Sequence, residues 1–202
     1  MDWHIIVGIL AGVLQIASII PYVRSMLYGT TRPNVVTQIL WTIFQVIALL
    51  AQFSSGASWS VIILIALTFN STLITILCFM GYGYKEYGLV DKICFVLAIL
   101  AIILWQITRE PLVALALSIV ADAIATWPTI VKTYRYPKTE APFPWLMTLT
   151  ASILSALSST KFNFANLAFP LYMIIIDLTI TYFAFFGKGH PKIRLEKSIL
   201  DK

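Results

Sequence analysis

The stretch ICFVLAILAIILWQIT, residues 93–108, contains no charged residue, and its polar side chains stand near its end. A run of this kind is typical of a helix in lipid, where about 20 apolar residues cross the hydrocarbon layer. Three further apolar stretches precede it and three follow it, and each of those six carries polar residues near its middle. The stretch therefore predicts a linker helix between two sets of three helices.

The composition of the whole chain is that of a membrane protein. Of its 202 residues, 59% are hydrophobic and only 11% are charged, whereas about a quarter are charged in soluble proteins. In lipid the backbone must satisfy its own hydrogen bonds, which favours helices for spans this long. We predict an all-α membrane protein with seven transmembrane helices. They are expected at roughly residues 5–23, 34–53, 59–80, 92–108, 111–133, 142–158 and 165–187.

Three positions of the first half recur 107 residues later: Gln15 as Asp122, Pro21 as Pro128 and Asn70 as Asp177. Internal symmetry of this kind is common in secondary transporters. An odd linker helix lets two three-helix units enter the membrane in the same direction, so we predict parallel repeats. The predicted order is a first repeat at 1–83, the linker helix at 84–110, a second repeat at 111–187 and a basic cytoplasmic tail at 188–202.

Basic residues are distributed unevenly between the two sides of this topology. Of the fourteen Lys and Arg residues, only Arg109 and Lys161 fall on the side of the amino terminus. Cytoplasmic loops carry such an excess, so we predict an amino terminus outside and a carboxyl terminus in the cytoplasm. A basic face beside anionic lipid then explains the net charge of +5 and needs no nucleic-acid partner.

Asp122 and Asp177 are the only acidic residues within the predicted spans. An ionised carboxylate at the centre of a membrane helix costs about 2.5–3.5 kcal/mol on insertion scales, so each must face a polar cavity, be protonated or be paired. No Lys, Arg or His lies at comparable depth. We therefore predict a proton or cation site at Asp122 and Asp177. The alternative is a structural, protonated Asp bonded to a neighbouring helix.

Helical spacing places further polar and aromatic side chains on common faces. The second predicted helix presents Gln38, Trp41 and Gln45 in one stripe, and the sixth presents Trp145 and Thr148 in another. The alternative for these side chains is ordinary helix packing. Together with the first helix, the predicted solute-lining residues are Gln15, Gln38, Trp41, Gln45, Trp145 and Thr148.

The two basic turns have the same layout. PYVRSMLYGTTRPN follows from Pro21 and PTIVKTYRYPKTEAPFP from Pro128, and each carries a second proline, Pro33 or Pro142, at the mouth of the next helix. With the three-one-three arrangement and an outside amino terminus, this layout resembles the SWEET and PQ-loop transporter superfamily. The resemblance covers most of the chain in layout and little of it in motif, since the Pro-Gln dipeptides are absent.

The resemblance implies roles for particular residues. SWEET transporters carry an asparagine in the middle of the third and seventh helices, and both contact substrate. Asn70 stands at the first of these places and Asp177 at the second. Prolines at the inner ends of helices one, two, five and six act as hinges in that family. The matching residues here are Pro21, Pro33, Pro128 and Pro142.

These observations favour a small secondary transporter or facilitator. Its expected cargo is a small polar solute, such as a sugar, amino acid, amine or vitamin, moved by alternating access with or without proton coupling. The alternative is a seven-helix receptor that binds its ligand without translocating it. We expect no enzyme, because the spans hold no nucleophile with a base, and no cofactor or metal site. The sequence leaves a homo-oligomer open.

Overall fold

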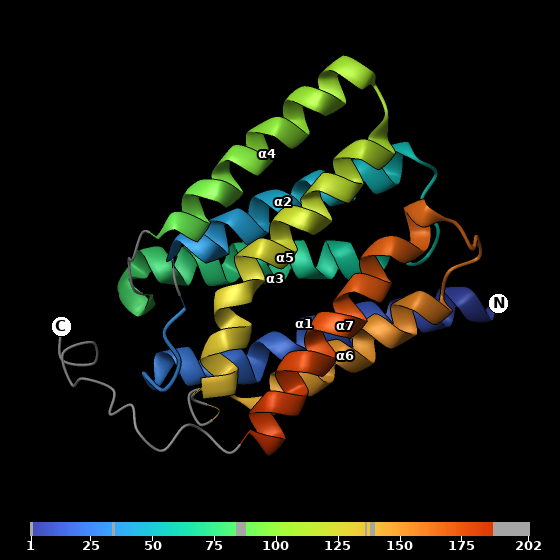
Figure 1. Cartoon of the computed structure of the whole chain (residues 1–202). Helices are drawn as coiled ribbons and strands as arrows, with labels where there is room; N and C mark the ends of the chain where they lie inside the picture. The colour runs from blue at the N-terminus through green and yellow to red at the C-terminus, as the bar shows by residue number, and fades with distance from the viewer. Residues whose placement is uncertain (1, 34, 84–87, 136, 138–139, 188–202) are drawn as a thin grey trace.

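The computed structural model describes residues 2–33, 35–83, 88–135, 137 and 140–187, and within these ranges it contains helices and no strand (Figure 1). The elements are α1 (Trp3–Leu27), α2 (Val35–Ser54), α3 (Val61–Leu77) continued by the π-helical turn η1 (Cys78–Tyr82), α4 (Leu89–Thr108), α5 (Pro111–Arg135), α6 (Pro142–Leu157) and α7 (Phe164–Phe186). The seven α-helices coincide with the seven predicted apolar stretches to within a few residues. The predicted all-α class is confirmed.

Five helices are long and apolar enough to cross a membrane. Within the described residues these are α1, α2, α3 with η1, α5 as far as Val131, and α7. Helix α6 is apolar but has only 16 residues, which reach about 24 Å at 1.5 Å per residue. Several membrane spans are thus available, and a span at α4 or α6 stays a prediction.

Local sequence explains where several helices begin and end. The side chains of Asp2 and Asn163 cap α1 and α7 by accepting hydrogen bonds from backbone N–H groups of the first turns. Pro142 is the first residue of α6, where a missing N–H breaks no helical bond. Gly83 and Gly187 follow the last residues of η1 and α7.

The helices pack as two groups of three that meet along two seams. Helix α3 packs against both α1 and α2, and α7 packs against both α5 and α6. Because α1 also packs against α6 and α2 against α5, the six helices form a closed ring. Helix α4 lies outside this ring, against α5 and α2, at the upper edge of Figure 1.

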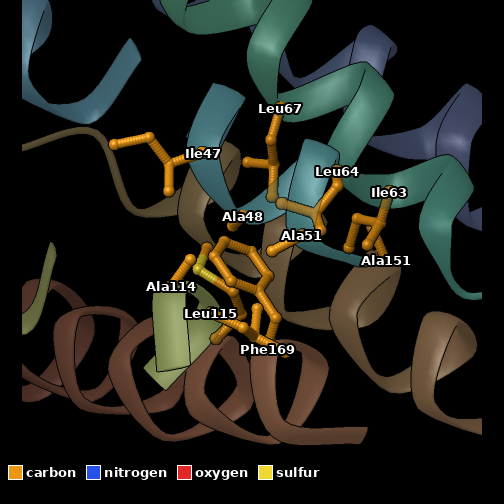
Figure 2. Packing of buried hydrophobic residues seen from close by; sticks show 11 residues of the cluster. Ile47, Ala48, Ala51, Ile63, Leu64, Leu67, Ala114, Leu115, Ala151 and Phe169 are labelled. Atoms are coloured by element: carbon orange, nitrogen blue, oxygen red, sulfur yellow. The ribbon is translucent and has the colours of Figure 1, made fainter. Parts of the chain in front are cut away.

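Apolar side chains fill part of the interior of the ring. One buried cluster joins residues of α2, α3, α5, α6 and α7, with Phe169 near its middle (Figure 2). Its buried members are Ile47, Ala48, Ala51, Ile63, Leu64, Leu67, Ala114, Leu115, Ala151, Phe169 and Met173. Many of these residues are small, so the helices can approach closely around the one large aromatic ring.

The outer surface is apolar while many polar side chains are buried. Val13, Ile20 and Ile175 expose 58%, 68% and 65% of their surface, whereas Asn166 and Asp177 are completely buried. In soluble proteins, charged residues such as Asp are mostly exposed. An apolar exterior around a polar interior is the arrangement that suits a lipid environment.

Small residues bring α1 close to α3. A Cβ atom added to Gly12 would lie 2.5 Å from Cγ2 of Ile62, and one added to Gly8 would lie 3.0 Å from the carbonyl oxygen of Trp59. Glycines four residues apart allow two helices in a membrane to pack with their backbones near each other.

The two ends of the ring differ in composition. We call the end with the α1–α2 and α5–α6 connections the basic end, since Arg24 and Arg32 are exposed there. The opposite end holds the α2–α3 loop (residues 55–60) and the α6–α7 loop (residues 158–163), and we call it the serine end.

Two close contacts between a glycine and a proline segment lie at the basic end. A Cβ on Gly83 would meet the carbonyl oxygen of Pro33 at 3.0 Å, and one on Gly187 would meet the ring of Pro137 at 3.1 Å.

Candidate solute-binding cavity

A cavity of about 110 Å³ lies among the six ring helices. This volume is several times the roughly 10–15 Å³ that a single water needs, so a small solute can be accommodated. Every ring helix contributes to its lining, and α4 contributes none of the described lining residues. The predicted site residues that line it are Gln15, Gln38, Trp41, Gln45, Asn70, Asp122, Trp145 and Thr148.

The cavity lies toward the basic end. Tyr22 lines it from the last turns of α1, Gln38 from the first turns of α2, and Pro144 from the first turn of α6. These helix ends adjoin the α1–α2 and α5–α6 connections.

Hydrogen bonds position the lining residues of the first three helices. The side-chain nitrogen of Asn70 donates to the backbone oxygen of Gln15 at 2.6 Å, which joins α3 to α1. The hydroxyl of Ser18 donates to the same oxygen at 2.6 Å. The hydroxyl of Ser71 donates to Oε1 of Gln45 at 2.6 Å, which joins α3 to α2.

Asp122 places a carboxyl group at the cavity from α5. The side chain is 6% exposed, and its Oδ2 accepts a hydrogen bond from the hydroxyl of Tyr172 on α7. Thr126, one turn further along α5, also lines the cavity and donates to the backbone oxygen of Asp122 at 2.8 Å. Sequence analysis did not single out Tyr172. The only signal was a polar aromatic residue five positions before Asp177.

Asp177 lies outside the cavity lining. It is fully buried, and its Oδ2 accepts a hydrogen bond from the hydroxyl of Ser152 on α6 at 2.9 Å, while Oδ1 has no partner. Its counterpart in the sequence repeat, Asn70, instead lines the cavity and bonds to α1. The two positions that match in sequence thus make different contacts, and Asp122 is the carboxyl group that reaches the cavity.

Several cavity-lining side chains keep buried atoms without a hydrogen-bond partner. These atoms are Oε1 of Gln15, Oε1 of Gln38, Oδ1 of Asn70 and Nε1 of Trp41. Most buried polar atoms in proteins are paired, so unpaired ones beside a cavity mark places where a bound molecule can supply the missing partner. Trp145 differs, because its Nε1 donates to Oε2 of Glu140 at 3.3 Å.

The predicted hinge prolines occupy different positions. Pro21 lies inside α1, Pro33 is buried shortly before α2 begins, and Pro142 opens α6. Pro128 falls within α5, and its side chain lies outside the described residues. Helix α5 bends along its C-terminal half (Figure 1). The hinge role of these prolines stays a prediction.

A network of buried polar groups joins the two loops of the serine end. Asn166 of α7 accepts a hydrogen bond from the backbone N–H of Ser58 at 2.8 Å, and Ser155 of α6 donates to the backbone oxygen of Ser60 at 3.1 Å. The hydroxyls of Ser58 and Ser60 lie 2.9 Å apart, and those of Ser58 and Ser159 lie 3.5 Å apart. The network closes the ring at the end away from the cavity.

Within the described ranges, no three His, Cys, Asp or Glu side chains come together as metal ligands. Comparison of the chain with protein-family models, with curated proteins and with solved structures gives no match. The site is therefore interpreted from its own geometry and chemistry.

Proposed function

We propose that this chain is a multi-pass integral membrane protein that moves a small polar solute by alternating access, as a secondary transporter or facilitator and not as an enzyme. The observation that carries the proposal is one cavity lined by all six ring helices, five of which contribute polar side chains, in a ring that hydrogen bonds close at the serine end. A site between two groups of helices, sealed at one end, is what a transporter needs in one of its two states.

The packing order of the helices supports a repeat architecture with seven spans. In each group of three, the last helix packs between the first two, as α3 does with α1 and α2, and α7 with α5 and α6. Parallel repeats related by an axis along the membrane normal would pack their three helices in the same order. We assign the chain on this basis to a fold like that of the SWEET and PQ-loop superfamily, with α4 as the linker.

The basic end is proposed to face the cytoplasm. The excess of Lys and Arg predicts this side, and the lining residues place the cavity toward it. The state with a closed serine end is then an inward-facing one. Breaking the serine-end hydrogen bonds and closing the basic end would produce the outward-facing state.

Uptake into proteoliposomes tests the proposal. Purified protein is reconstituted and screened with sugars, amino acids, amines and vitamins, with and without a pH gradient. We expect at least one solute to accumulate faster than in protein-free liposomes. If Asp122 carries the proton, the Asp122→Asn variant should lose any stimulation of transport by the gradient.

A matched control uses a chain locked at the serine end. Cysteines at Ser58 and Ser159, whose hydroxyls lie 3.5 Å apart, should form a disulfide on oxidation that stops transport. Reduction should restore it. Binding without uptake in every assay would favour the receptor alternative, and undiminished uptake by the oxidised pair would exclude alternating access through this end.

A further inference from the structure

We propose that the cavity binds a small primary ammonium solute, a molecule with one –NH3⁺ group on a compact apolar body. The inference deepens the function proposed above and rests on it. Three features of the lining carry it: its buried unpaired acceptors, its carboxyl group and its aromatic walls.

In the described part of the chain, three of the four fully buried lining atoms without a partner are acceptors. Asn70 is the clearest case. Its side-chain nitrogen donates to the backbone oxygen of Gln15, which fixes the orientation of the amide, and its Oδ1 has no hydrogen-bond partner. The side-chain oxygens of Gln15 and Gln38 are also buried without a partner. An ammonium group offers three N–H donors and no acceptor, so it matches this set.

The charges around the cavity favour a cation. Asp122 contributes a carboxyl group to the lining, and a second acid, Glu140, bonds to the indole of Trp145 beside it. No Lys, Arg or His belongs to the lining as far as the structure describes it. A hydrogen bond between an ammonium and a carboxylate is about twice as strong as one between neutral groups.

The walls suit an apolar body next to the charge. Tyr22, Trp41 and Trp145 line the cavity with aromatic rings, and Leu67 and Met173 add aliphatic surface. Aromatic faces attract cations by about 0.5–2 kcal/mol, more when water is excluded.

Equilibrium dialysis tests the inference with three probes of equal chain length. The full chain in lipid nanodiscs is dialysed against labelled butylamine, 1-butanol or butyrate at neutral pH, with empty nanodiscs as the blank. We expect butylammonium to bind at least about tenfold more tightly than the other two. Equal or weaker binding of butylammonium, or binding of none of the three probes, would overturn the inference.

Two variants locate the binding. Asp122→Asn keeps the shape of the side chain and removes its charge, so butylammonium affinity should fall about ten- to hundredfold. Asp177→Asn makes the same change at the buried acid that does not line the cavity, and affinity should stay within about twofold of the parent. If both variants bind like the parent, or if Asp177→Asn loses affinity as Asp122→Asn does, the cavity assignment is wrong.

A second variant tests the cavity at a residue other than Asp122, so that a folding defect of Asp122→Asn does not decide the outcome. Gln38→Met has nearly the same volume and removes an oxygen that has no partner in the protein, so no intramolecular bond to that oxygen is lost. Butylammonium affinity should drop several-fold with stability unchanged or raised. Dialysis measures binding alone, so the two proposals can fail separately. Selective binding of butylammonium without flux would refute only the transport proposal. Flux of a neutral solute without amine selectivity would refute only this inference.

Discussion

Asp177 depends on one described donor, the hydroxyl of Ser152 at 2.9 Å, and is fully buried. Ser152→Ala leaves both carboxyl oxygens without a partner, which we expect to destabilise the protein by about 1–3 kcal/mol. Chemical unfolding of the purified protein in mild detergent measures the change. Thr150→Ala on the same helix is the control, because that exposed hydroxyl bonds only to its own helix. An equal effect in both variants would contradict the role of Ser152.

Eight of the eighteen described residues that line the cavity were predicted from the sequence, but their contacts were not. Gln38, Trp41 and Trp145 were predictable, because polar and aromatic residues at helical spacing in an apolar helix must turn away from lipid. The position of Asp177 was not predictable from its match with Asn70. Spacing along one helix defines a face, whereas the neighbour that the face meets depends on how the helices pack. Tyr172 was missed for the same reason.

At the scale of elements, the close approach of α1 to α3 depends on Gly12. Gly12→Val places side-chain atoms where Ile62 already lies, so α1 and α3 must move apart. We expect a loss of about 1–3 kcal/mol in unfolding free energy, as for other overpacked sites. Val13→Leu is the control on the neighbouring residue, which is 58% exposed, and it should leave stability within about 0.5 kcal/mol. Similar losses in both variants would argue against the close-packing explanation.

Pro21 interrupts the hydrogen bonding of α1 beside the cavity, since proline has no N–H to donate. We expect Pro21→Ala to fold normally and to bind solute with parental affinity, while transport slows because the helix bends less readily. Flux and equilibrium binding, measured on the same reconstituted sample, separate the two effects. Pro111→Ala is the control, because Pro111 is the first residue of α5 and breaks no helical bond. Parental flux in Pro21→Ala would make this proline a tolerated kink.

Helix boundaries were predictable from the lengths of the apolar stretches and from Pro142. The irregular end of α3 was not. Residues Cys78–Tyr82 form a π-helical turn, and φ at Gly81 is +103°, a conformation that favours glycine. The sequence carries no signal for the widened turn, because one extra residue in a helical turn leaves the composition unchanged.

At the scale of the molecule, the distribution of Lys and Arg predicts which end faces outside. A single cysteine at Ser55 or Lys161, in a background without the native cysteines, should react with an impermeant thiol reagent added to intact cells. A cysteine at Lys138 or Lys192 should react only after the membrane is permeabilised. Protein labelled under denaturing conditions gives the maximum signal for each variant. Reversed labelling would overturn the orientation and the assignment of the inward-facing state.

The arrangement of the whole ring lay beyond sequence reasoning. Hydropathy located seven helices and the repeat suggested two groups of three, but neither gives the order of packing within a group. The serine-end network was also unpredicted. Ser58 and Asn166 lie 108 residues apart in the sequence. Each belongs to a short polar segment that looks like an ordinary connection between helices, and only the fold brings the two segments together.

Both acids within the spans belong to the second group of helices, Asp122 to α5 and Asp177 to α7, while the matching positions in α1 and α3 are neutral. A rocking motion of one group against the other would therefore carry acidic side chains at membrane depth in the second group only. Moving a unit charge across the whole membrane is worth about 2.3 kcal/mol per 100 mV. If Asp122 crosses part of that field in its charged form and returns neutralised by a bound cation, the transmembrane voltage acts on one half of the cycle and not on the other. Two similarly packed groups of helices would then give a transport cycle that responds to voltage in one direction only.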